Sequence, residues 1–450
     1  MTISEKSEVC LRKFAEQSET VAPRCREGIE KYRKGNFRIV LKDERGNPLK
    51  GKKVTVRQRT HDFKFGANIF LLDEFKEDWK NKAYRKMFKE YFNLATVPFY
   101  WNDLEPEEGK PRYAADSPKI YRRPAPDLCV DYCEKNGILP KLHCLFYDVH
   151  IPKWLPVNDE AEMRRLYEKR FSEIARRYRG RMYEFEVTNE ILLEPGWTWR
   201  SVLSKQKNCV EWAFGMAEKY FPGETLVINE AQVLDPIARD GYTAKYVLQL
   251  EKLLAKGTPI DKIGIQHHIF SGVELPAGSE ASDEEIRRHA EEFMNPGNIL
   301  KALDILAEFG LPLELTEVTI PTLGASEEAE ELQARLLENL YTLWFSHPAV
   351  ASVVYWNTIE HAAYINPSGN WNEDNCRGGL FHSDITPKKS ARTLHRLFHE
   401  TWHTDLELTT DDRGAVEFRG FYGEYTAQAD GVPLFFGLHK NGEKSIEIVL

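Results

Sequence analysis

No stretch of this 450-residue chain is apolar for the roughly 18 residues that a membrane-spanning helix needs, so we expect no contact with a membrane. The first residues, MTISEKSEVCLRKF, are polar and charged where a secretion signal has an apolar segment. We therefore expect either a cytoplasmic protein or a secreted protein whose signal has been trimmed.

The seven cysteines are odd in number and widely spaced, and no C-x-x-C motif occurs. This pattern excludes a zinc ribbon and a thioredoxin-type redox site. Cys129 and Cys133 lie four apart in a segment of helical pattern, and we expect them to be small buried apolar residues. We expect neither a metal nor an organic cofactor.

The chain also has fewer basic residues than acidic ones. The chain has 61 Lys and Arg against 70 Asp and Glu, a net charge of −9. Such a balance argues against a nucleic-acid-binding surface, and a neutral or weakly charged ligand fits better.

From about residue 62 to 400, short β-rich runs alternate with longer segments of helical periodicity. We expect parallel strands at 65–70, 94–100, 139–146, 183–188, 225–229, 262–266, 311–316 and 352–356. Eight such βα units favour a (β/α)8 barrel of the α/β class. A doubly wound sheet is the rival, but no Gly-rich phosphate loop follows the first strand.

The two ends of the chain differ from this middle. Residues 36–60 predict two strands after an N-terminal helix, and residues 405–450 predict three or four more. Neither end has enough strands for an independent sandwich. We expect residues 1–61 and 401–450 to pair into one accessory β-sandwich beside a catalytic barrel of residues 62–400.

Active sites of such barrels lie at the carboxyl ends of the strands. The fourth predicted strand ends at Asn189–Glu190, the fifth at Asn229–Glu230 and the seventh at Thr316–Glu317. A pair of carboxylates facing each other from different strands can hydrolyse a glycosidic bond, one as proton donor and the other as nucleophile or base. Any single glutamate here could equally cap a helix or form an ion pair.

Five segments, in chain order, resemble motifs of glycoside hydrolase family 10, the xylanase-like retaining glycosidases. They are WNDLEPEEGK (101–110), HCLFYDVHIPKWL (143–155), VTNE (187–190), KIGIQHH (262–268) and ELTEVTI (314–320). The resemblance covers about residues 62–395. It implies a retaining hydrolase that cleaves β-glycosidic bonds by double displacement, endo-β-1,4-xylanase-like by family default.

The resemblance also implies roles for individual residues. Glu190 would be the acid/base and Glu317 the nucleophile, whereas Glu230 on the fifth strand would be no proton donor. The residues expected to bind the carbohydrate substrate are Asn189, at the sugar 2-hydroxyl; Gln266, near Glu190; His268, hydrogen-bonded to Glu317 and helping to keep it ionised; Trp356, at the floor of the reacting subsite; and His143, Asp148, Tyr100 and Trp197. His267 should point away from the site.

Departures from the family pattern fall among the sugar-binding positions. The family places Asn, Glu and Lys before the Trp that follows strand two, where they hold the sugar on the non-reducing side; here Val97, Pro98 and Tyr100 stand there. The family's Trp–His on strand three is Tyr147–Asp148. These changes suggest a different β-glycoside, or exo-acting cleavage, as a second hypothesis.

Two other readings are open. A carbohydrate-binding barrel without activity is one, although both glutamates are present. A metal-dependent barrel hydrolase using His267, His268, Asp148 or His150 is the other, and it is disfavoured because adjacent histidines on a strand diverge.

Overall fold

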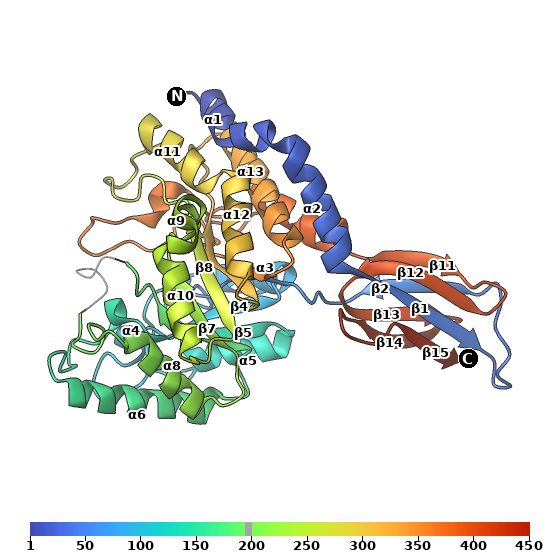
Figure 1. The fold of residues 1–450 in the computed structure, drawn as a ribbon, viewed down its shortest axis with the longest axis horizontal. Coiled ribbons are helices and arrows are strands. Elements are labelled where there is room, and N and C mark those ends of the chain that lie inside the picture. The colour runs from blue at the N-terminus through green and yellow to red at the C-terminus, as the bar shows by residue number, and fades with distance from the viewer. Residues whose placement is uncertain (194–199) are drawn as a thin grey trace.

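The computed structural model describes residues 1–193 and 200–450, and its centre is a closed barrel of eight parallel strands (Figure 1). The strands follow the order β10-β3-β4-β5-β6-β7-β8-β9 around the barrel. Their bounds are β3 (Lys64–Asn68), β4 (Leu94–Pro98), β5 (Leu139–Phe146), β6 (Glu184–Asn189), β7 (Leu226–Glu230), β8 (Lys262–His268), β9 (Leu313–Thr319) and β10 (Val350–Tyr355). The predicted (β/α)8 fold is confirmed.

Helices cover the outside of the barrel, and their apolar stripes face it. The helices are α3 (Asp78–Tyr91), α4 (Trp101–Leu104), α5 (Pro126–Asn136), α6 (Glu160–Tyr178), α8 (Cys209–Tyr220), α9 (Leu234–Asp240), α10 (Lys245–Ala255), α11 (Asp283–Phe293), α12 (Pro296–Ala307), α13 (Glu327–Ser346) and α14 (Lys389–Arg396). Helix α6 shows how the sequence specifies them. Asp159 caps its first turn by accepting the backbone N–H of Glu162, and Met163, Phe171 and Ile174 on one face are buried.

The barrel interior below the mouth is charged. Lys141 on β5 lies 3.5 Å from Glu184, 3.2 Å from Glu186 and in contact with Glu314, and Lys262 on β8 pairs with Glu184. These side chains are fully or almost fully buried. Buried charges are stable only when they are paired, so these lysines and glutamates hold one another in place. Glu186 connects this group of ion pairs to the site at the mouth.

The two ends of the chain form a β-sandwich that projects from one side of the barrel (Figure 1). One sheet has the order β12-β1-β15 and the other β11-β2-β13-β14. The strands are β1 (Lys34–Lys42), β2 (Lys53–Gln58), β11 (Asp405–Thr409), β12 (Ala415–Phe421), β13 (Gly423–Ala429), β14 (Val432–Leu438) and β15 (Ser445–Val449). Strand β1 pairs with β12 and β15, and β2 pairs with β11 and β13. The predicted pairing of the two ends is confirmed.

The sequence predicted one N-terminal helix, and the structure has two, α1 (Ile3–Glu16) and α2 (Ser18–Arg33). Helix α1 packs on α11 and α13, and α2 packs on α13 and leads directly into β1. The N-terminal segment therefore runs along the barrel wall before it enters the sandwich. In the described residues, no helix combines the length and apolarity that crossing a membrane requires.

Candidate active site

Glu190 stands at the barrel mouth, directly after β6. Its backbone adopts the left-handed conformation, with φ 56°, and its N–H donates to the carbonyl of Asn229 on β7 at 3.0 Å. A non-glycine residue holds this conformation at a cost and only where its surroundings fix it. Its carboxylate accepts a hydrogen bond from Nε2 of Gln266 at 2.9 Å and another from the hydroxyl of Tyr147.

Glu317 enters the mouth from β9, and the residue is only 5% exposed. Three groups hold its carboxylate. Nε2 of Gln266 lies 2.9 Å and Nδ2 of Asn229 3.0 Å from Oε1, and Nε2 of His268 lies 3.2 Å from Oε2. The contact with His268 that the resemblance implied is present.

One nitrogen thus contacts both carboxylates. The Oε1 atoms of Glu190 and Glu317 can lie no farther apart than the two 2.9 Å bonds to Gln266 placed end to end. Retaining glycosidases have a carboxyl separation of about 5–5.5 Å, whereas inverting enzymes need about 6.5–9.5 Å to admit water. The upper bound here favours the retaining geometry.

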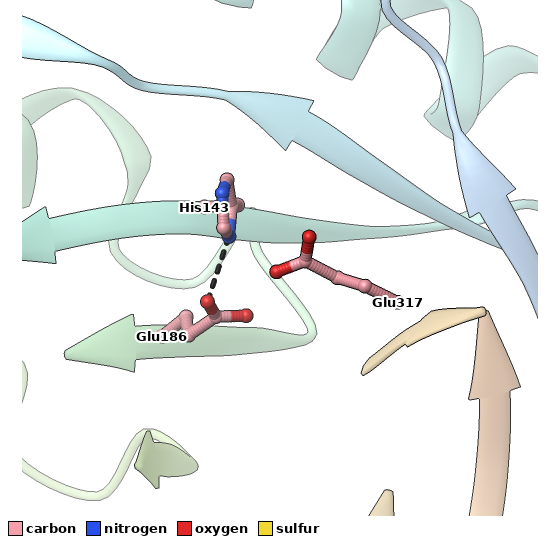
Figure 2. A group of neighbouring side chains, drawn as sticks. All are labelled: His143, Glu186 and Glu317. Atoms are coloured by element: carbon pink, nitrogen blue, oxygen red, sulfur yellow. Dashed lines mark hydrogen bonds and ion pairs between the residues drawn. The ribbon is translucent and has the colours of Figure 1, made fainter. Parts of the chain in front are cut away.

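His143 and Glu186 form a pair beneath Glu317. Nδ1 of His143 lies 2.7 Å from Oε1 of Glu186, and Nε2 lies 3.0 Å from the hydroxyl of Tyr100. Figure 2 shows the His143–Glu186 contact with the Glu317 carboxylate beside it. Burial disfavours a charge on His143, but the carboxylates of Glu186 and Glu317 outweigh it and raise the pKa of His143.

The ionisation of Glu317 reflects opposing effects. Burial raises its pKa, to about 8, and Glu186 and Glu190 add to this, whereas His143 and Lys141 lower it. The resemblance led us to expect that His268 hydrogen-bonds Glu317 and helps to keep it ionised. Instead, burial lowers the pKa of His268 to about 4, so its imidazole is neutral at pH 7 and donates a hydrogen bond rather than supplying a positive charge.

Asn229 and Glu230 form hydrogen bonds to Asn189 and to the backbone directly after Glu190. Nδ2 of Asn229 lies 2.9 Å from Glu186, 2.8 Å from Asn189 and 3.0 Å from Glu317, so it joins the carboxylates at the centre of the mouth. Glu230 is fully buried, and each of its carboxyl oxygens accepts a backbone N–H 3.1 Å away, from Ile191 and Leu192. Glu230 therefore anchors the chain just after Glu190.

Aromatic rings line the other side of the mouth. Trp356, which follows β10, packs with ring centres 5.5 Å from His143 and 6.2 Å from His268. Tyr100, which follows β4, lies edge-on to His143 at 5.1 Å. Both expected residues are thus next to the carboxylate cluster, and they are only 5% and 7% exposed.

The sequence profile of Glycosyl hydrolase family 10 matches residues 61–396, which comprise the whole barrel. This chain belongs to that family. It is similar to Endo-1,4-beta-xylanase 2 of Arabidopsis thaliana, with 26% identity over 84% of this chain and 31% of the relative. Endo-1,4-beta-xylanase 1 of the same plant is also 26% identical, over 93% of this chain and 39% of the relative. The chain thus spans about a third of the length of these relatives.

Solved structures agree with the family on the fold. The crystal structure of native xylanase 10B from Thermotoga maritima superposes with a TM-score of 0.59 at 19% identity, covering 76% of this chain and 96% of that one. At this identity the likeness concerns the barrel fold alone.

One family-based expectation needs correction. Asp148 does not face the mouth of this family 10 barrel, because its buried carboxylate accepts hydrogen bonds from Ser201 at 2.6 Å, from the hydroxyl of Ser204 and from Tyr167 at 3.3 Å. Both residues come after the end of β5: Tyr147 contacts Glu190 from the loop, and Asp148 begins a short 3-10 helix (Asp148–His150) that directs its carboxylate away from the mouth. Trp197, also expected at the site, lies outside the described residues.

The side chains at the mouth can be compared with the hypothesis of a metal-dependent hydrolase. Within residues 1–193 and 200–450, one group of side chains has metal-ligand spacing: His143, Glu186 and Glu317, with ligand atoms within 4.8 Å of one another. It contains none of the four residues that reading required. Lys141 already contacts Glu186, and Tyr100 already contacts His143, so the group is an organised hydrogen-bond network.

Glu186 is the one residue of this cluster that the sequence did not suggest. Tyr147, Asn229 and Glu230 were placed near the rim, but their contacts with the carboxylates and with the chain after Glu190 were not predicted. A signal existed for Glu186. Two glutamates, Glu184 and Glu186, lie two residues apart in an apolar strand, so both must face the same side of the barrel wall. No comparable sequence pattern marks Asn229. Its contact with Glu317 exists only because the closed barrel places β7 close to β9.

Proposed function

We propose that this chain hydrolyses β-glycosidic bonds by double displacement, with Glu190 as acid/base and Glu317 as nucleophile. The observation that carries the proposal is the single Gln266 nitrogen bonded to both carboxylates, which fits the short separation of a retaining pair. β-1,4-Xylosidic bonds are the first substrate class to test, because the similar relatives are named endo-1,4-beta-xylanases.

The proposed first step breaks the bond between the anomeric carbon and the leaving oxygen. The carboxylate of Glu317 attacks that carbon while Glu190 gives its proton to the departing oxygen. In the second step Glu190 takes a proton from water, the water oxygen attacks the same carbon, and the Glu317 carboxylate is released. Configuration at the carbon is inverted twice and so retained.

The surrounding residues suit these steps. Asn229, Gln266 and neutral His268 all direct donors at Glu317, and they stabilise its ionised form. Asn189, whose Oδ1 is held by Asn229 and Gln266, presents its amide nitrogen to the sugar 2-hydroxyl. In this proposal residues 62–400 are the catalytic domain, and residues 1–61 with 401–450 form an accessory module that braces it.

The decisive test combines Glu190→Ala and Glu317→Ala with azide and an activated aryl β-glycoside. In Glu190→Ala, azide should replace water on the glycosyl-enzyme and give a β-glycosyl azide. In Glu317→Ala, azide should attack from the opposite face in place of the nucleophile and give an α-glycosyl azide. Exchanged products would reverse the assignments, and full activity in both variants would refute the proposal. A wild-type protein that binds xylan but hydrolyses no glycoside would establish the binding-barrel alternative.

A further inference from the structure

Arg122 ties together two loops across one end of the barrel mouth. It lies in the loop that follows β4, and it donates to Oδ1 of Asn357 at 2.7 Å and to the carbonyl of Ala362, both in the loop that follows β10. Strand β3 lies between β4 and β10 in the barrel. We call Arg122, Asn357 and Ala362 the mouth bridge; it spans the end of β3.

The bridge is a built feature of the chain rather than a chance surface contact. Arg122 is only 4% exposed, and both Arg122 and Asn357 adopt the left-handed conformation with φ 62°. Such residues persist where surrounding contacts hold them. Asn357 is held in turn by its Nδ2, which donates to Glu373, and the N–H of Ala363 donates to Asp374 at 3.0 Å.

Aromatic side chains fill the space between the bridge and the carboxylates. The ring of Phe70, after β3, lies 5.1 Å from Trp356 and 6.0 Å from Tyr100, and the Arg122 guanidinium lies 5.9 Å from its centre. The Arg123 guanidinium lies 4.3 Å from the centre of Tyr100. Phe70, Tyr100 and Trp356 are at most 7% exposed, so no ring face is open for a second sugar to stack on.

This closed end lies away from the leaving group. Glu190, which hands its proton to the leaving oxygen in the proposed mechanism, follows β6, three strands from β3. Trp356 instead contacts His143 and His268, the residues beside the nucleophile Glu317. The bridge and its aromatic packing therefore cover the side on which the non-reducing part of a sugar chain would extend.

We propose that the mouth bridge limits this enzyme to one sugar unit on the non-reducing side of the cleaved bond. It then removes single sugars from chain ends or from short β-glycosides, and it does not cut within a polymer. This inference rests on the proposed function and specifies the substrates of the same site.

The wild-type protein provides the first test. We expect kcat/KM for 4-nitrophenyl β-xyloside to exceed that for 4-nitrophenyl β-xylobioside at least tenfold, with the β-glucoside and β-cellobioside as a parallel pair. Reduced xylohexaose should first give xylose and reduced xylopentaose in equal amounts, with no xylobiose or xylotriose. Equal use of both aryl glycosides, or early internal products, would overturn the inference and leave the proposed function standing. No hydrolysis of any glycoside would overturn the proposed function itself.

Variants then address the bridge directly. Arg122→Ala should raise the kcat/KM ratio of the bioside to the monosaccharide glycoside at least tenfold, because it opens the end of the mouth. Lys110→Ala is the matched control: this exposed residue of the same loop pairs only with its exposed neighbour Glu107, and its variant should leave the ratio unchanged. If Arg122→Ala has the circular dichroism of the native protein and an unchanged kcat/KM ratio, the mouth bridge does not limit the enzyme to one sugar unit.

Discussion

Glu190 and Glu317 share one hydrogen-bond donor: each places its Oε1 atom 2.9 Å from the side-chain nitrogen of Gln266. Glutamates from strands that are three positions apart in the barrel are thereby held at a fixed separation by a side chain from a strand between them. Gln266 therefore positions the proposed acid/base and the proposed nucleophile together.

Gln266→Ala should lower kcat/KM about 10–100-fold, because hydrogen bonds to charged groups contribute about 1.5–3 kcal/mol each. Both carboxylates remain, so azide should not rescue the activity. Gln249→Ala, on the outer helix α10, is the control and should behave like wild type. Steady-state kinetics on an aryl β-glycoside measures both, and an unaffected Gln266→Ala variant would contradict a shared positioning role.

The pH profile should show an acidic limb well above the range of an ordinary glutamate. Glu317 must be ionised to attack, and burial raises its pKa. Activity is therefore present above that pKa and lost as the pH falls through it. The pH dependence of kcat/KM reports groups of the free enzyme. A limb at or below about 4.5, the ordinary region for this side chain, would mean that the hydrogen-bond donors outweigh burial.

His143→Gln should move this acidic limb upward by about one pH unit, because it removes a cation close to Glu317. Lys141, Glu186 and Glu190 also face Glu317 and are kept in the variant. His267→Gln provides the comparison. His267 is equally buried, but it points outward to the carbonyl of Phe293 at 3.1 Å. The acidic limb of the His267→Gln variant should therefore lie at the same pH as in the wild type. Identical profiles for the two variants would exclude the electrostatic effect.

Glu230→Gln should reduce kcat about tenfold with little change in KM. The amide can accept only one of the two backbone hydrogen bonds that hold Ile191 and Leu192, so Glu190 loses part of its anchor. Glu230 does not transfer a proton in the proposed mechanism, and azide should have no effect on the variant. A rise in KM alone would point to substrate binding instead.

Two adjacent phenylalanines of β14 should differ sharply in their effect on stability. Phe436 is 8% exposed and stacks on Phe37 at 4.5 Å, so Phe436→Ala should cost about 3–5 kcal/mol of sandwich stability. Phe435 is 75% exposed, and Phe435→Ala should change stability by no more than about 0.5 kcal/mol. Urea denaturation of the full chain measures both. Equal losses would show that the two side chains share one environment.

The barrel could be predicted because its strands carry their own signal. Buried parallel strands are short, β-branched and apolar, and their number and spacing decide the fold without reference to side-chain contacts. The strand ends then place Glu190 and Glu317 at one rim. The sandwich followed from a shortage of strands at each end, which only pairing between the ends could satisfy.

Contacts within the site could be predicted only where direction follows from alternation. His267 and His268 on β8 are the clearest case: His268 contacts Glu317 in the mouth, and its neighbour points outward to Phe293. Tyr147 and Asp148 lie beyond the end of β5, where alternation no longer applies. The mouth bridge was beyond prediction for another reason. Arg122 and Ala362 lie on two long loops whose courses depend on left-handed conformations at Arg122 and Asn357. Asparagine favours that conformation more than most residues, but arginine does not.

Strands β1 and β2 have a consequence for biosynthesis, since their partners come after the entire barrel in the chain. On the ribosome both strands emerge early, with unpaired edges, and wait until β11 to β15 have been made. The whole barrel is synthesised in this interval, so the sandwich can close only after every barrel strand has been made. Synthesis that stops before residue 405 would leave an enzyme domain with two exposed strands, a form that quality control can recognise by its open edges.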